Sequence, residues 1–148
     1  MCVADQYSIA YPPGWVAHPR DVDLGIPECT FFGEDPLRPA IDEEGRWVGI
    51  RVVVWLGRHC RGSFDRAVTE EQIEVQGFPA WKREVADGHA PAAAPPSAYE
   101  YFVDLTPGAQ CEVARWLQVR TESIAPGGLE GNNPIVDRMV ASLRFATD

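Results

Sequence analysis

Residues 47–56 read WVGIRVVVWL, a run with one charged side chain, Arg51. Successive side chains of a β-strand point to opposite faces, so alternate positions share a face. Both faces of this run are almost wholly apolar, which is typical of a strand covered on both sides. We therefore predict that residues 47–56 form the central strand of a sheet. One face holds Val48, Ile50, Val52, Val54 and Leu56, and the other holds Trp47, Gly49, Arg51, Val53 and Trp55.

Further strand and turn patterns lie on both sides of this run. Ser63 is a suitable N-cap for a short helix over residues 63–68. Gln76-Gly77 predicts a tight turn between two strands. Period-two patterns and turn residues place the other predicted strands at 7–11, 30–32, 72–75, 79–85, 99–105 and 112–121, with a short final strand within 142–145.

The clearest helix pattern is near the C-terminus. Asn133 can cap this helix and Pro134 suits its first turn. An amphipathic stripe follows, and strand runs flanked by a few helices indicate an α+β fold. We expect a central, largely antiparallel sheet flanked by helices, closed by this C-terminal amphipathic helix. The stripe consists of Ile135, Val136, Met139, Val140 and Leu143.

Length and charge limit the possible functions. The chain has 148 residues and a formal net charge of -9, and its length suits one domain spanning 1–148. An acidic protein is poorly suited to nucleic acid or to anionic membranes, which attract Lys and Arg patches. No run of about 18 apolar residues is present, so no transmembrane segment is predicted.

The four cysteines, Cys2, Cys29, Cys60 and Cys111, permit two disulfides. Cys29 precedes the strand at 30–32 and Cys60 follows the strand at 47–56, so antiparallel pairing of these strands would bring the two cysteines together. We therefore favour Cys29–Cys60, with Cys2–Cys111 as the remaining pair. The alternative is four reduced, buried thiols.

The cysteines and the N-terminus also bear on the compartment. Met1 is followed at once by Cys2, and a strand-like segment begins at Tyr7. One interpretation is an extracytoplasmic or secreted domain whose leader has been removed, with a possible lipid anchor in the native precursor. The other is an ordinary cytoplasmic N-terminus.

The sequence predicts no catalytic residues, metal site or cofactor. His18, His59 and His89 lie in loop-like segments, and we find no nucleophile elbow, phosphate-binding glycine loop or metalloprotease motif. The aromatic residues are more informative, because five tryptophans can pack under helices or line a ligand groove. The candidate ligand-pocket residues are Trp47, Arg51, Trp55, Trp116 and Arg120.

Four patches stand out in order along the chain: YSIAYPPGW (7–15), CTFFGEDP (29–36), QGFPAW (76–81) and IVDRMVASLRF (135–145). Together they resemble small secreted actinobacterial proteins of the PsbP-like superfamily, with the LpqN-type mycobacterial lipoproteins as broader relatives. This resemblance implies a PsbP-like α/β/α sandwich and no particular activity, because fold does not determine function.

These observations lead to one principal expectation and two alternatives. We expect a non-enzymatic, extracytoplasmic binding or accessory module for a protein or small-molecule partner whose identity the sequence does not give. The first alternative is a cytosolic partner-binding protein of the same fold. The second is a small hydrolase or a thiol-dependent enzyme.

Overall fold

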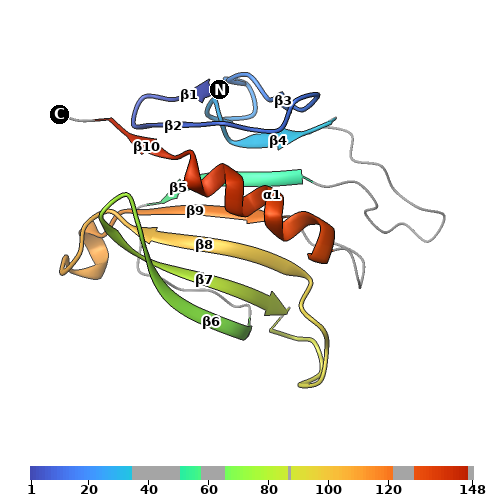
Figure 1. The fold of residues 1–148 in the computed structure, drawn as a ribbon. Helices are drawn as coiled ribbons and strands as arrows, with labels where there is room; N and C mark the ends of the chain where they lie inside the picture. The colour runs from blue at the N-terminus through green and yellow to red at the C-terminus, as the bar shows by residue number, and fades with distance from the viewer. Residues whose placement is uncertain (35–50, 58–65, 87, 122–128, 147–148) are drawn as a thin grey trace.

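The computed structural model describes residues 1–34, 51–57, 66–86, 88–121 and 129–146. Its described part contains two antiparallel sheets (Figure 1). The larger sheet has the strand order β3-β4-β5-β9-β8-β7-β6, and the smaller has the order β1-β2-β10. The larger sheet is formed by β3 (Val16–Ala17), β4 (Phe31–Gly33), β5 (Arg51–Gly57), β6 (Arg66–Val75), β7 (Phe78–Ala86), β8 (Ala98–Asp104) and β9 (Trp116–Thr121).

The smaller sheet joins the two ends of the described chain. Its strands are β1 (Cys2–Val3), β2 (Tyr7–Ile9) and β10 (Arg144–Phe145). Between β9 and β10 the chain forms helix α1 (Leu129–Ala141), which lies across one face of the larger sheet over β8 and β9 (Figure 1). A short 3-10 helix, η1 (Cys111–Val113), precedes β9.

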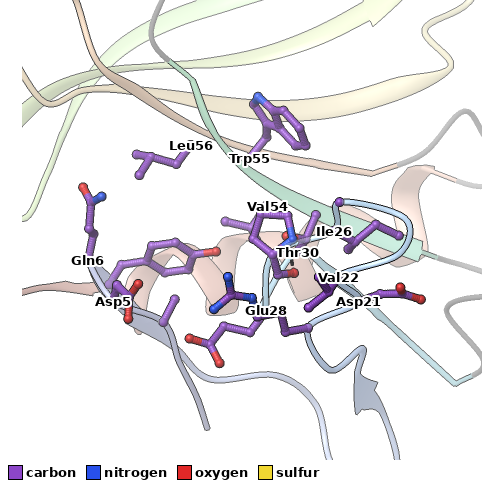
Figure 2. Close-up of a pocket in the computed structure, with 15 residues that line it drawn as sticks. Asp5, Gln6, Asp21, Val22, Ile26, Glu28, Thr30, Val54, Trp55 and Leu56 are labelled. Atoms are coloured by element: carbon purple, nitrogen blue, oxygen red, sulfur yellow. Dashed lines mark hydrogen bonds between the residues drawn. The ribbon is translucent and has the colours of Figure 1, made fainter.

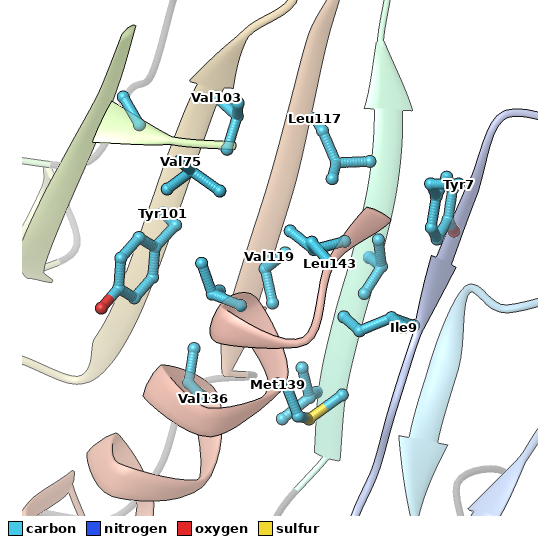
Figure 3. Close-up of a cluster of buried hydrophobic side chains, with 14 of the residues drawn as sticks. Tyr7, Ile9, Val75, Tyr101, Val103, Leu117, Val119, Val136, Met139 and Leu143 are labelled. Carbon is cyan, nitrogen blue, oxygen red and sulfur yellow. The ribbon is translucent and has the colours of Figure 1, made fainter. Parts of the chain in front are cut away.

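The hydrophobic core lies between α1, β2 and one face of the larger sheet (Figure 3). Apolar residues recur on one side of α1 and at alternate positions of the strands beneath it, so burying both apolar surfaces together removes them from water. The helix contributes Val136 and Met139, and Leu143 follows directly after its end. The strands contribute Ile9, Val52, Val54, Tyr101, Val103, Leu117 and Val119.

The expected α+β sandwich flanked by helices is wrong. The described part of the protein is mostly β, and α1 is its one α-helix. Of the segment predicted as a helix at 63–68, residues 66–68 begin the long strand β6 instead, and residues 63–65 lie outside the described residues. β6 forms one edge of the larger sheet and carries exposed glutamates. A charged edge strand of this kind resists pairing with other chains, and β6 still pairs with β7 within the sheet.

The C-terminal helix was predicted correctly in type but not in its start. α1 begins at Leu129, so Asn133 lies within the helix and does not cap it. Pro134 also lies inside the helix.

The turn at Gln76-Gly77 is confirmed, since β6 and β7 pair as far as Val75 and Phe78. Both turn residues have positive φ (52° and 85°), as a type I′ hairpin turn requires.

The prediction for the central strand holds in part. β5 lies inside the larger sheet, between β4 and β9, and its Val52 and Val54 are buried beneath α1 and β2. Residues 47–50 of the predicted strand lie outside the described residues. The opposite face of β5 is not fully covered, because the side chain of Trp55 is 53% exposed.

Asp137 fastens α1 to the sheet. Its Oδ1 accepts hydrogen bonds from the hydroxyls of Tyr99 at 2.5 Å and Tyr101 at 2.7 Å. Burial and these bonds raise the pKa of both phenols, so both remain neutral donors at physiological pH.

We expect Asp137→Asn to lower the free energy of unfolding by about 1–2 kcal/mol, because it weakens two hydrogen bonds to a charged acceptor. Urea denaturation measures this change. Glu112→Gln, at an exposed position on η1, is the matched control and should change stability by less than about 0.5 kcal/mol. Equal effects of the two substitutions would show that Asp137 does not hold the helix.

Candidate functional site

A pocket of about 410 Å³ lies where the smaller sheet meets β5 (Figure 2). One wall is the turn between β1 and β2, residues 4–7, and the second is the loop at 20–28. The third wall is β5 at residues 54–56. Ligand pockets in proteins usually measure about 300–1,000 Å³, so this one suits a small molecule or a few residues of a peptide.

The pocket has a buried, largely apolar floor. Tyr7, Thr30 and Val54 are buried, and Ile26 is half-buried beside them. The polar atoms of the floor are already satisfied: the Tyr7 hydroxyl donates to the Cys29 carbonyl at 2.8 Å, and the Thr30 hydroxyl donates to the Pro27 carbonyl at 2.9 Å. Burial also raises the pKa of Tyr7, with a smaller contribution from Glu28. The floor could therefore contact a ligand through its shape and its apolar surface rather than through charged groups.

The rim of the pocket is charged. Asp5, Asp21 and Glu28 supply three carboxylates, and Arg20 supplies one guanidinium. Asp5, Arg20 and Glu28 are exposed. Such a rim has an excess of negative charge and favours a ligand that carries a cationic group.

The loop wall is held in a defined shape by backbone hydrogen bonds. Asp21 and Ile26 exchange two of them, at 2.9 and 2.8 Å, and so close a small hairpin. The Asp21 carboxylate also accepts the Leu24 N–H at 3.0 Å. Val22 at the tip of this hairpin is 78% exposed and lies at the pocket edge.

A disulfide fastens two walls of the pocket to each other. Cys2 of β1 is bonded to Cys29, which directly follows the loop wall. The sequence-based pairing of Cys29 with Cys60 is therefore wrong, and so is its complement, Cys2–Cys111. The prediction failed because it assumed that the cysteines flanking β4 and β5 meet, whereas β1 approaches Cys29 from the smaller sheet. Cys60 lies outside the described residues, as does the side chain of Cys111.

Cys29 has an unusual backbone conformation. Its φ is 57°, in the left-handed region that residues other than glycine seldom occupy. The disulfide and the hydrogen bond from Tyr7 hold this residue in place. Both bonds link the loop wall to the smaller sheet, so they fix the relative position of these two walls of the pocket.

The residues predicted to line a ligand pocket lie mainly on the face of the larger sheet that is opposite α1. Val53, Trp55 and Gly57 are alternate residues of β5 and share this face. Arg120 and Trp116 of β9 pair with Val53 and Gly57, so they lie on the same face. Arg51 belongs to the same face by its position in β5, but its side chain is outside the described residues, and so is Trp47. Trp55 also borders the pocket, and its ring points away from Val54 (Figure 2).

A buried charge network occupies the centre of that opposite face. Glu100 is 0% exposed, and its carboxylate lies 3.5 Å from Arg83 Nε and 3.6 Å from Arg120 Nη1. Gln118 Nε2 donates to the same carboxylate at 2.8 Å, and Glu70 lies 3.5 Å from Arg83 Nε. Arg83 and Arg120 therefore each lie beside a carboxylate of the protein.

Aromatic side chains pack beside this network. The ring of Trp116 lies 5.6 Å from that of Trp81 and 6.1 Å from that of Phe102, measured between centroids. The Arg83 guanidinium stacks over Phe102 at 5.7 Å. This arrangement is typical of packing, so Trp116 and Arg120 contribute to the structure of the sheet.

The two described histidines, His18 and His89, belong to different parts of the larger sheet. His18 follows β3 and is buried, whereas His89 is exposed in the segment after β7, and four strands lie between β3 and β7 in the sheet order. His59 lies outside the described residues. Among the residues that are described, no group of three His, Cys, Asp or Glu side chains could hold a metal ion. None of the described helices is long and apolar enough to cross a membrane.

Sequence reasoning missed most of the pocket. Tyr7 was placed in a predicted strand and Arg20 and Glu28 lay outside the predicted elements, but nothing indicated that these segments meet at the end of β5. The one usable signal was Cys2, because a disulfide to Cys29 requires the N-terminal strand to reach the end of that loop.

Comparison with known proteins adds one partial match. No protein-family model matches the chain. Over 57 residues the chain is 35% identical to an acylphosphatase of Gloeobacter violaceus. This match covers 37% of the chain and 61% of the acylphosphatase, so the chain spans less than two thirds of that relative.

Proposed function

We propose that this protein is a non-enzymatic binding module whose ligand occupies the pocket between the β1–β2 turn, the loop at 20–28 and β5. The observation that carries the proposal is a pocket of about 410 Å³ whose walls are joined by the Cys2–Cys29 disulfide. Fixing the walls in advance reduces the entropy that a ligand must overcome on binding.

We also propose an extracytoplasmic location. Disulfides persist mainly in oxidising compartments, and the Cys2–Cys29 bond supports this assignment. A relationship to the small secreted PsbP-like and LpqN-type proteins remains part of the proposal. It rests on the four sequence patches and not on an α/β/α sandwich.

The partial match favours a second candidate, hydrolysis of an acyl phosphate. A phosphate group needs surroundings in which cationic side chains and N–H donors outweigh carboxylates. The pocket rim holds Arg20 among three carboxylates, and Arg83 and Arg120 are paired with Glu100. The described residues therefore support ligand binding better than this hydrolysis.

An NMR screen of a fragment library against the labelled, oxidised protein tests the binding proposal. Fragments with cationic groups are expected to shift the backbone amides of residues 4–7, 20–30 and 54–56. Val22→Trp, at the exposed edge of the pocket, should weaken these fragments, whereas Val68→Trp, on the distant strand β6, should not. Shifts confined to other surfaces would refute the proposal, and release of phosphate from benzoyl phosphate would favour the second candidate.

A further inference from the structure

One edge of β5 loses its partner strand at the pocket. β4 pairs with β5 from Gly33 opposite Arg51 to Phe31 opposite Val53. The Val54 N–H then donates to the Thr30 carbonyl at 2.7 Å. Before Thr30 the chain turns into the loop at 20–28, so β4 does not extend along the rest of β5.

The direction of the remaining backbone groups follows from the register. In an antiparallel ladder, residues alternate between those that bond to one neighbouring strand and those that bond to the other. Val54 directs its N–H toward β4, so Val53, Trp55 and Gly57 bond toward β9. Leu56 must therefore direct its N–H and C=O away from β9, toward the edge of β5 along which β4 no longer pairs.

Leu56 lines the pocket on that side. Among the described residues, no strand pairs with β5 beyond Val54 on this edge. The pocket therefore presents one donor and one acceptor from the same residue, in the geometry that a further β-strand would use. Peptides bind to exposed sheet edges in this way, with backbone hydrogen bonds and pockets for alternate side chains.

The rim indicates which peptide would be preferred. Asp5, Asp21 and Glu28 outnumber Arg20, and no ion pair joins Asp5, Arg20 or Glu28 to another described residue. A basic side chain on the peptide would be attracted by this excess of negative charge. The apolar floor formed by Tyr7, Thr30 and Val54 would accommodate the aliphatic part of such a side chain.

We propose that the pocket binds a short extended peptide segment with a basic residue, which pairs its backbone with Leu56 and places its cation at the carboxylate rim. This proposal rests on the binding function proposed above and specifies its ligand. The residue opposite Leu56 would exchange two hydrogen bonds with it and would direct its side chain to the same face of the sheet as Leu56.

Three blocked tripeptides, titrated by NMR into the oxidised protein, test the proposal. Acetyl-Ala-Lys-Ala-amide is expected to bind and to shift the Leu56 amide. Replacing the central lysine with glutamate should weaken binding about tenfold, because the charge is reversed at an acidic rim. Methylation of the lysine backbone nitrogen should weaken it by a similar factor, because one hydrogen bond to Leu56 is lost.

Two protein variants separate the rim from general charge effects. Glu28→Gln should weaken the lysine peptide about threefold, and the loss should shrink in high salt. Glu74→Gln, on β6 at the far edge of the larger sheet, removes the same charge and should leave affinity unchanged. Both side chains are exposed, so neither substitution should affect folding.

The outcomes distinguish this inference from the broader proposal. If the lysine and glutamate peptides bind equally, or if backbone methylation has no effect, the peptide inference is wrong. If no peptide binds but cationic fragments still shift the pocket amides, the peptide inference fails and the binding function stands. If neither peptides nor fragments shift these amides, both fail.

Discussion

Replacing Glu100 with alanine is expected to lower the free energy of unfolding by about 3–5 kcal/mol, the cost of removing one partner from a buried ion pair. Glu100 is fully buried and lies within 3.6 Å of the guanidinium groups of both Arg83 and Arg120. Without it, Arg83 keeps only the partly exposed Glu70 as a described ion-pair partner. Urea denaturation of Glu100→Ala measures the loss.

Two comparisons make the Glu100 prediction specific. Glu70→Ala removes a 40% exposed carboxylate from the same arginine and should cost less than about 1 kcal/mol. The double variant Glu100→Met/Arg83→Met should recover part of the loss, because apolar side chains of similar size can replace a buried pair. A small effect of Glu100→Ala, comparable with that of Glu70→Ala, would contradict a buried network on this face.

Removing the Cys2–Cys29 disulfide is the second change with a large expected effect. The bond spans a sequence separation of 27 residues, and a closed loop of this length contributes about 3–4 kcal/mol in the chain-entropy model. Cys2→Ser should therefore lower the free energy of unfolding by about this amount, measured in urea without reductant. Val3→Ser, at the exposed neighbouring position on β1, is the control and should cost about 0.5 kcal/mol or less.

The same substitution also tests the role of the disulfide in the pocket. Cys2→Ser releases β1 from Cys29, so the wall at 4–7 is no longer joined covalently to the loop wall. Pocket ligands should bind less tightly to Cys2→Ser than to Val3→Ser. If Cys2→Ser left both stability and ligand affinity unchanged, Cys2–Cys29 would have no part in organising the site.

The sequence patterns predicted individual elements better than their arrangement. The Gln76-Gly77 turn, the apolar alternation of β8 and the stripe of α1 depend on neighbouring residues, and each was recognised correctly. The start of α1 was misplaced because Pro134 and Asn133 are typical of a helix N-terminus, yet the helix continues through them. Tertiary packing overrides such local preferences.

The candidate site could not be predicted because it depends on where strands end. Leu56 appears in the sequence only as an apolar residue of a strand, and its exposed N–H and C=O follow from the early end of β4 beside it. The contact between β1 and Cys29 depends on the smaller sheet, which pairs residues 2–3, 7–9 and 144–145. The pairing of β2 with β10 joins residues at opposite ends of the chain, and no periodic pattern in the sequence reveals it.

Hydrogen exchange at the Leu56 amide tests the central claim most directly. Val54 donates to the Thr30 carbonyl, and its amide should exchange slowly. Leu56, two positions along the same strand, should exchange at least about tenfold faster in the free protein and should become protected when the lysine tripeptide is added. A Leu56 amide already as protected as Val54 in the free protein would show that this edge of β5 is closed, and would contradict the account of the pocket.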